Sequence, residues 1–102
     1  MLRNLLENAI IYRSQERPTV IKISCGCVES YSFVQIEDNG IGLDEAQIPL
    51  IFQRFYRSEQ ARGQEGCGIG LYLSREIVLL QKGMMKAKQM KPGLLIEVNL
   101  PV

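Results

Sequence analysis

The chain has 102 residues, which is enough for one compact domain and too few for two. It contains 46% hydrophobic and 23% charged residues, and its net charge of +1 gives no field that would steer it toward nucleic acid or an anionic membrane. Histidine is absent, which excludes histidine metal ligands and Ser-His-Asp or Cys-His hydrolysis. The chemistry must therefore come from carboxylates, amides, arginines and glycine-rich backbone.

The first predicted element is an amphipathic helix over residues 2–12, because apolar residues recur there at helical spacing. Two strands follow over residues 19–25 and 31–38, where apolar and polar residues alternate. Asp38 shares its face with apolar residues, so its carboxylate is expected to leave the strand pointing toward the core. The apolar positions are Leu2, Leu5, Leu6 and Ala9 in the helix, Ile21, Ile23 and Cys25 in the first strand, and Val34 and Ile36 in the second.

The middle of the chain predicts less regular structure. A short helix is expected near residues 44–49 and a further turn near 51–56. Residues 57–66 are polar and have no periodicity, so they are expected to form a mobile loop.

A longer helix is predicted over residues 69–82, with Gly83 as its stop, and a hairpin then joins strands over 84–90 and 94–100. The order of elements predicts an α+β fold, a two-layer sandwich with a mixed, mostly antiparallel sheet and helices on one face. The signal for the helix is the stripe Ile69, Leu73, Ile77 and Leu80, and the last strand is expected to bury Leu94, Ile96, Val98 and Leu100.

Asn4 and Asn8 lie one turn apart on the first predicted helix, opposite its leucine stripe. Two amides on one helix face can hold a divalent cation through their oxygens, or order phosphate oxygens around it. Exposed asparagine pairs are also common on helices, so the spacing leaves both interpretations open.

Residues 38–42 (DNGIG) directly follow a predicted strand. Gly40 and Gly42 permit a tight turn and the close approach of a ligand. An inward-facing carboxylate at Asp38 needs a hydrogen-bond donor, because an unpaired buried carboxylate is costly, and the exocyclic amine of a purine is one such donor. A plain Asp-Asn-Gly turn is the alternative.

Residues 66–71 (GCGIGL) run directly into the strongest predicted helix. Glycine-rich backbone that opens a helix presents free N–H groups and the positive end of the helix dipole to an anion. The polar segment before it contains Arg57 and Arg62, which indicates a flexible, cationic lid. Phe52, Phe55 and Tyr56 either anchor the base of this lid or belong to the core.

Four motifs occur in a fixed order: residues 4–12 (NLLENAIIY), 38–42 (DNGIG), 52–57 (FQRFYR) and 66–71 (GCGIGL). Together they resemble the N, G1, F and G2 boxes of sensor histidine kinases, over nearly the whole chain. The resemblance implies that residues 1–102 form a Bergerat-type ATP-binding domain. Histidine kinases, gyrase-type topoisomerases, heat-shock chaperone ATPases and mismatch-repair ATPases share this domain.

The resemblance also implies a role for each matching residue. Asn8 corresponds to the Mg²⁺-binding asparagine, and Asn4 to the polar position one turn before it. Tyr12 corresponds to the aromatic residue that packs on adenine, and Asp38 to the carboxylate that accepts a hydrogen bond from the adenine amine. Arg57 corresponds to a phosphate-contacting arginine. The pocket, the lid and the phosphate-binding turn are matched by Gly40 and Gly42, by Phe55, and by Gly66, Gly68, Gly70 and Leu71.

Some positions depart from the family's pattern. Ile11 stands where a basic residue often reaches the phosphates, and Cys67 stands where Thr or Ser is frequent. Lys82 replaces the first of two common glycines. The chain also begins at the N box, so the strand and helix that normally precede this box are expected to be missing.

The implied function is transfer of the γ-phosphate of ATP, with Mg²⁺, to a histidine on a separate dimerisation domain. Asn4, Glu7 and Arg57 are the implied catalytic residues, and a response regulator is the downstream partner. No nucleic acid and no direct membrane contact are expected. The three cysteines indicate reduced thiols, so the chain is expected in the cytoplasm, with its parent protein anchored in the inner or plasma membrane.

Three other functions stay open. ATP hydrolases of the gyrase or chaperone branch carry a glutamate where Asn4 stands, and a carboxylate can act as a general base whereas an amide cannot. Glu7, close by, keeps hydrolysis open. A serine kinase of the anti-sigma type has the same boxes. The third is a non-catalytic nucleotide sensor or docking module, which the apolar Ile11 and the expected absence of the N-terminal elements favour.

Overall fold

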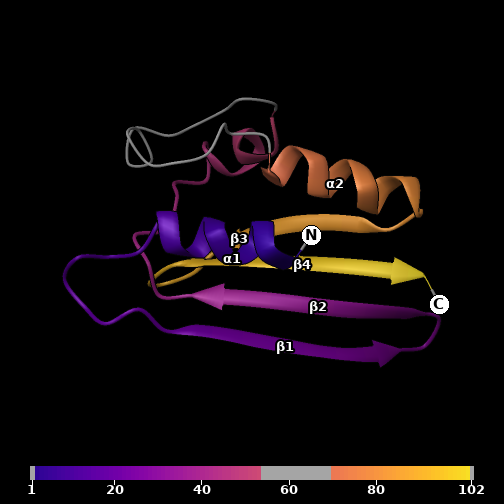
Figure 1. Cartoon of the computed structure of the whole chain (residues 1–102), viewed down its shortest axis with the longest axis horizontal. Helices are drawn as coiled ribbons and strands as arrows, with labels where there is room; N and C mark the ends of the chain where they lie inside the picture. The colour runs from indigo at the N-terminus through magenta and orange to yellow at the C-terminus, as the bar shows by residue number, and fades with distance from the viewer. Residues whose placement is uncertain (1, 54–69, 102) are drawn as a thin grey trace.

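The computed structural model of the chain describes residues 2–53 and 70–101. Its four strands form one sheet in the order β1-β2-β4-β3, and the helices lie on one side of this sheet (Figure 1). The three strand pairs of the described residues are all antiparallel, so the expected two-layer α+β arrangement is confirmed. The elements are α1 (Leu2–Ile11), β1 (Ile21–Val28), β2 (Tyr31–Asp38), the 3-10 helix η1 (Ile48–Phe52), α2 (Gly70–Leu80), β3 (Met84–Gln89) and β4 (Leu94–Pro101).

The core lies between the sheet and the helices, where alternate residues of β2 and β4 face α1 and α2. The pairing places Ile36 opposite Ile96 and Val34 opposite Val98, so the apolar faces of the two central strands coincide. Leu5 of α1 and Val78 of α2 pack onto this face and are fully buried. The core residues are Leu5, Tyr12, Ile36, Leu43, Ile51, Val78, Met85, Leu94, Ile96 and Val98. Leu100, expected among them, is only partly buried.

Strand β1 is an edge strand, and its residues are mostly exposed. Ile23 lies opposite Ile36 and therefore on the helix side of the sheet, yet it is 52% exposed. Cys25 and Cys27 share this side and are exposed as well. The alternation correctly predicted the face, but the described helices cover β2 and β4 and leave β1 open.

The short helix expected near residues 44–49 begins later than predicted. Asp44 accepts backbone hydrogen bonds from Gln47 and Ile48 in a turn, and η1 starts only at Ile48. Pro49 suits the first turn of this 3-10 helix because no helical partner is lost there. The mobile loop expected over residues 57–66 lies outside the described residues.

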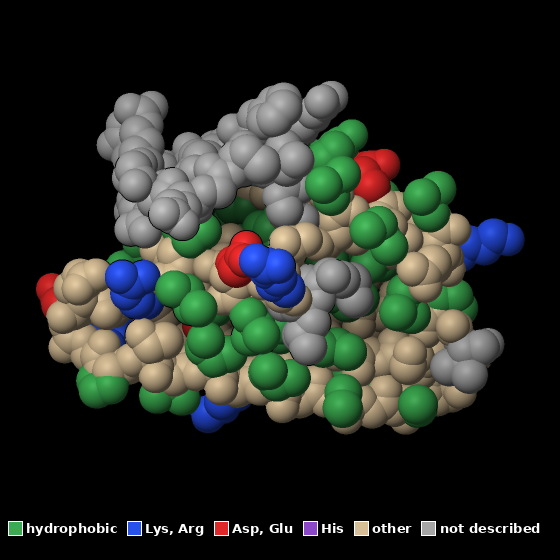
Figure 2. All heavy atoms as spheres, in the orientation of Figure 1, with side chains coloured by type: hydrophobic (Ala, Val, Ile, Leu, Met, Phe, Trp, Pro, Cys, Tyr) green, Lys and Arg blue, Asp and Glu red, His purple; other side chains and the backbone are tan. Residues whose placement is uncertain are grey.

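Helix α2 begins at Gly70, close to the predicted start, and ends at Leu80, two residues before the predicted end, but the predicted stripe is not its buried face. Leu73, Ile77 and Leu80 are 45%, 47% and 83% exposed. The buried side instead carries Ser74 and Val78. The helix is apolar nearly all round, so hydrophobic spacing alone could not tell which side faces the core. Figure 2 shows hydrophobic side chains on the molecular surface where Figure 1 draws α2.

The end of α2 is a Schellman motif in which Lys82, and not Gly83, adopts the left-handed conformation. The N–H of Gly83 donates to Val78 and that of Lys82 donates to Leu79, while Lys82 has a φ of 61°. Gly83 is required for a different reason, because a Cβ there would overlap the carbonyl oxygen of Asn99. Among the described residues, no helix has the length and hydrophobicity needed to cross a membrane.

Lys82→Gly is expected to raise the free energy of unfolding by about 0.5–1 kcal/mol, because glycine occupies the left-handed region without the strain of a side chain. Urea denaturation of the two proteins measures the difference. Gly83→Ala is the matched control and is expected to lower stability, since its Cβ has no room. Equal or lower stability of Lys82→Gly would contradict this account of the helix end.

Candidate functional site

Helix α1 turns its amide face inward. Asn8 is only 8% exposed and Tyr12 only 5% exposed, and both follow Asn4 at one-turn spacing. The two asparagines were expected opposite the buried leucines. Asn8 is instead buried like Leu5, and Asn4 is partly buried. The pair is therefore no solvated helix surface.

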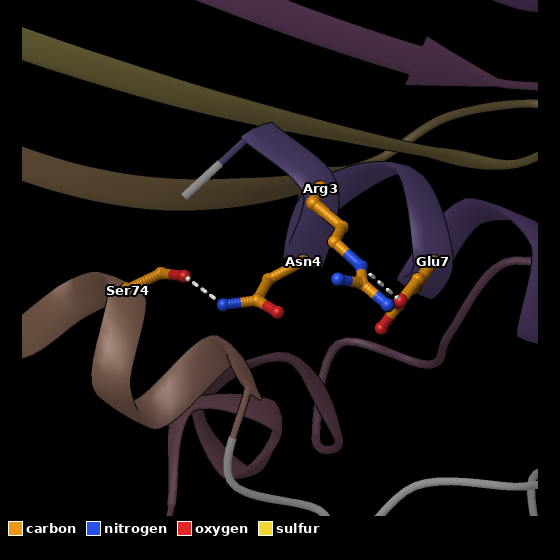
Figure 3. A network of polar contacts seen from close by, with 4 residues as sticks. All are labelled: Arg3, Asn4, Glu7 and Ser74. Atoms are coloured by element: carbon orange, nitrogen blue, oxygen red, sulfur yellow. Dashed lines mark hydrogen bonds and ion pairs between the residues drawn. The ribbon is translucent and has the colours of Figure 1, made fainter.

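Asn4 contacts α2 directly. Its side-chain Nδ2 donates to Ser74 Oγ at 3.1 Å, and Figure 3 shows the two side chains pointing toward each other from the two helices. Ser74 is fully buried. Sequence reasoning missed this serine, because the predicted stripe of α2 placed it on the wrong side. A small polar residue among leucines was the available signal.

Among the buried side-chain nitrogen and oxygen atoms of the described residues, the amide nitrogen of Asn8 is the one that has no hydrogen-bond partner. Buried polar groups in native proteins are nearly always paired, and leaving one unpaired costs about 1–3 kcal/mol. The described protein atoms therefore give no structural reason for an asparagine here. A buried N–H donor of this kind needs an acceptor that the described protein atoms do not supply, such as a water molecule or an oxygen of a bound anion.

Glu7 lies at the surface of α1 and is paired within its own helix. Its carboxylate binds Arg3 Nε at 3.0 Å, and both side chains are largely exposed (Figure 3). This i, i+4 pair satisfies the carboxylate at the helix surface. The arrangement gives Glu7 a plain structural role.

Asp38 ends β2 on the core side, as its position in the strand predicted, and is 5% exposed. Its Oδ1 accepts the N–H of Gly40 at 2.9 Å, and the N–H of Leu94 also donates to the carboxylate. Burial raises the pKa of Asp38 above its ordinary value, although these two N–H groups act in the opposite direction. The buried carboxylate has acceptor positions left for a further hydrogen-bond donor.

The glycines of the turn allow three chain segments to meet beside Asp38. Gly40 lies against the end of α1, where a Cβ would overlap the carbonyl oxygen of Tyr12. Gly42 has a φ of 71°, and its Cβ would lie 2.9 Å from the carbonyl oxygen of Gly93. Gly93 in turn leaves no room for a Cβ beside the backbone of Asp38. Gly40 and Gly42 were predicted site residues, whereas Gly93 lies in the predicted hairpin connection and was not among them.

A second missed residue is Arg17, in the loop between α1 and β1. Its guanidinium donates to the carbonyl oxygens of Asn39 and Gly40, at 2.7 and 2.9 Å. The side chain of Asn39 binds the same loop, because it donates to the carbonyl oxygen of Pro18 and accepts from the N–H of Val20. No motif contained Arg17, because its partners are backbone atoms that a sequence pattern does not identify.

Several predicted site residues cannot be placed. Phe55, Arg57, Gly66 and Gly68 lie outside the described residues. Gly70 is the first residue of α2, and Leu71 packs partly buried against the core. Among the predicted residues, the structure brings Tyr12, Asp38 and Gly40 together, and Asn4 and Asn8 precede Tyr12 along α1.

The family described as histidine kinase-, DNA gyrase B- and HSP90-like ATPase matches residues 1–102. The chain belongs to this family. It is 38% identical over 95 residues to the sensor histidine kinase YkoH of Bacillus subtilis, covering 91% of this chain and 20% of that protein. It is 34% identical over 101 residues to the sensor protein CiaH of Streptococcus pneumoniae, covering 96% and 22%. The expected resemblance to sensor histidine kinases is confirmed.

Solved structures give the same result for the fold. The mycobacterial sensor histidine kinase MprB superposes with a TM-score of 0.83 at 27% identity, covering 96% of this chain and 67% of that chain. The catalytic domain of the histidine kinase ThkA gives a TM-score of 0.81 at 24% identity, covering 98% and 63%. The chain thus has the fold of histidine kinase catalytic domains, and it spans about a fifth of the length of YkoH and CiaH.

The raised pKa of Asp38 predicts how stability depends on pH. A buried carboxyl with a raised pKa destabilises the fold in its ionised form, and this penalty is lost as the pH falls through that pKa toward the unfolded value of 3.8. Relative to Asp38→Asn, the wild-type chain is therefore expected to gain stability on acidification from pH 7. Urea denaturation at a series of pH values measures the difference. A relative loss of wild-type stability in acid would show that the pKa is lowered instead.

Proposed function

We propose that this chain binds ATP between α1, the turn at residues 38–42 and the start of α2, and that it transfers the γ-phosphate to a histidine on a separate dimerisation domain. One observation carries the proposal. A buried carboxylate and a buried, unpaired amide, on Asp38 and Asn8, lie on two elements that meet at Tyr12 and Gly40. The Asn8 nitrogen has no partner among the described protein atoms, and the Asp38 carboxylate accepts only from backbone N–H groups.

Asp38 is the proposed adenine-recognition residue. A carboxylate accepts hydrogen bonds only, and the exocyclic amine of adenine donates them. The N–H groups of Gly40 and Leu94 hold the side chain in one direction. The buried aromatic ring of Tyr12, directly after α1, supplies an apolar surface on which a base can pack.

Asn8 is the proposed Mg²⁺ ligand. Magnesium prefers oxygen ligands and is commonly held by one or two protein groups together with substrate phosphates. Among residues 2–53 and 70–101, no three Cys, Asp or Glu side chains converge on a metal site. An amide oxygen from Asn8, completed by nucleotide phosphates, fits this chain better than a carboxylate cage. The bound ion would neutralise charge on the phosphates.

The acceptor must come from outside this chain, because the chain contains no histidine. Asn4 supports transfer rather than hydrolysis, because its amide cannot remove a proton from water and it donates to Ser74. Phosphoryl transfer depends chiefly on positioning and charge neutralisation, which the chain can supply without a base of its own. In the parent protein we place this domain on the cytoplasmic side of a membrane anchor, upstream of a response regulator.

Asn8→Ala is expected to weaken binding of Mg-ADP by about tenfold or more, because it removes a ligand of the ion. The free energy of unfolding should change by less than about 1 kcal/mol, since the amide nitrogen has no partner to lose. Isothermal titration and urea denaturation measure the two quantities. Asn4→Ala is the contrasting variant, expected to lower stability because Ser74 loses its donor. A large loss of stability with unchanged Mg-ADP affinity in Asn8→Ala would contradict the assignment.

The transfer step is tested with radiolabelled ATP and the histidine-containing dimerisation domain of the parent protein, added in trans. We expect label on that domain in an acid-labile, base-stable bond, which is the chemistry of phosphohistidine. Label on serine would favour a serine kinase. ATP binding without any transfer would favour a nucleotide sensor, and free phosphate alone would favour a hydrolase.

A further inference from the structure

We propose that Arg17 is a positioning residue for adenine recognition, acting on Asp38 through a single peptide group. The inference rests on the proposed function, because it assumes that Asp38 receives the adenine amine. Arg17 lies in the loop after α1, half-buried, and its planar guanidinium reaches two consecutive carbonyl oxygens of the turn that follows β2. It does not contact the carboxylate through any hydrogen bond or ion pair described among these residues.

The peptide between Asn39 and Gly40 connects the two side chains. Its carbonyl oxygen accepts from Arg17 Nε at 2.7 Å, and its N–H donates to Asp38 Oδ1 at 2.9 Å. The two bonds lie on opposite edges of one planar group, so fixing the carbonyl also fixes the direction of the N–H. A charged donor on the carbonyl also polarises the peptide and strengthens the bond that the N–H makes.

The surrounding contacts hold other parts of the turn. Among the described contacts, only Arg17 holds the carbonyl side of this peptide. The N–H of Ile41 donates to Tyr12 at 2.8 Å, which anchors the turn to α1. The side chain of Asn39 anchors it to Pro18 and Val20. The described contacts include no other hydrogen bond to the carbonyl oxygen of Asn39.

Arginine suits this position better than lysine. The forked guanidinium supplies two N–H groups in a fixed geometry, and the two acceptors belong to adjacent residues, Asn39 and Gly40. A lysine ammonium is a single point on a flexible stem and would satisfy one carbonyl with less control of direction. Arg17→Lys therefore keeps the charge and loses part of the positioning.

The test compares ADP with purine riboside 5′-diphosphate, which is ADP without the exocyclic amine. Arg17→Ala is expected to weaken ADP binding about tenfold, while binding of the amine-free nucleotide changes by less than about twofold. Arg17→Lys should give an intermediate loss for ADP. The decisive quantity is the ratio of the two affinities, because general loosening of the fold weakens both nucleotides together.

Arg13→Ala is the matched control. Arg13 lies four residues before Arg17 in the same loop, is exposed, and its side chain donates to the carbonyl oxygen of Ile10 at 2.8 Å. Its removal changes the net charge by the same amount and should leave both nucleotide affinities unchanged. Circular dichroism shows whether each variant is folded. If Arg17→Ala does not fold, the comparison of the two nucleotides is made with Arg17→Lys.

A double-mutant comparison separates this inference from the proposed function. In an Asp38→Asn background, Arg17→Ala should cause no further loss of ADP preference, because both act on one contact. Equal weakening of both nucleotides by Arg17→Ala, or no change, would overturn the role of Arg17. If Asp38→Asn alone leaves the preference for ADP intact, the adenine contact itself is wrong, and the proposed function fails at that residue.

Discussion

The buried carboxylate of Asp38 is the constraint on which the surrounding structure depends. It ends a core strand on the side that faces the helices, and a charged group in that position must be supplied with donors. The N–H groups of Gly40 and Leu94 meet this need, and they bring the turn and the hairpin of β3 and β4 to one point. Residues 40, 42 and 93 are glycines because backbone atoms of neighbouring segments occupy the space that a Cβ would need.

Helix α1 connects this carboxylate to the rest of the candidate site. At its end, the carbonyl oxygen of Tyr12 accepts from the turn of residues 38–42, and near its start Asn4 donates to Ser74 of α2. Asn4 is paired with Ser74 and has a structural role there, whereas the nitrogen of Asn8 is buried without a partner. Leaving a buried donor unpaired costs stability. The two asparagines, one turn apart on the same helix, therefore differ in whether the described protein atoms pair the amide nitrogen.

The sequence predicted those features that depend on local periodicity. The two-residue alternation of β2 correctly predicted that Asp38 faces inward, and the glycine-rich motif correctly placed the start of α2 near Gly70. Features that depend on packing between distant elements could not be predicted from the sequence. Helix α2 is apolar nearly all round, so its buried face is decided by contacts with Asn4 and the sheet. Arg17 binds only backbone carbonyls of the turn, and no residue pattern records such partners.

The pKa of the Asp38 carboxyl, followed by ¹³C NMR with and without ADP, tests the central claim most directly. A donor that binds the ionised carboxylate stabilises that form and lowers its pKa. Without nucleotide, the pKa is expected above the ordinary value because of burial. Saturating ADP should lower it, and purine riboside 5′-diphosphate, which lacks the amine, should not. A pKa that stays unchanged or rises when ADP is bound would contradict adenine recognition by Asp38.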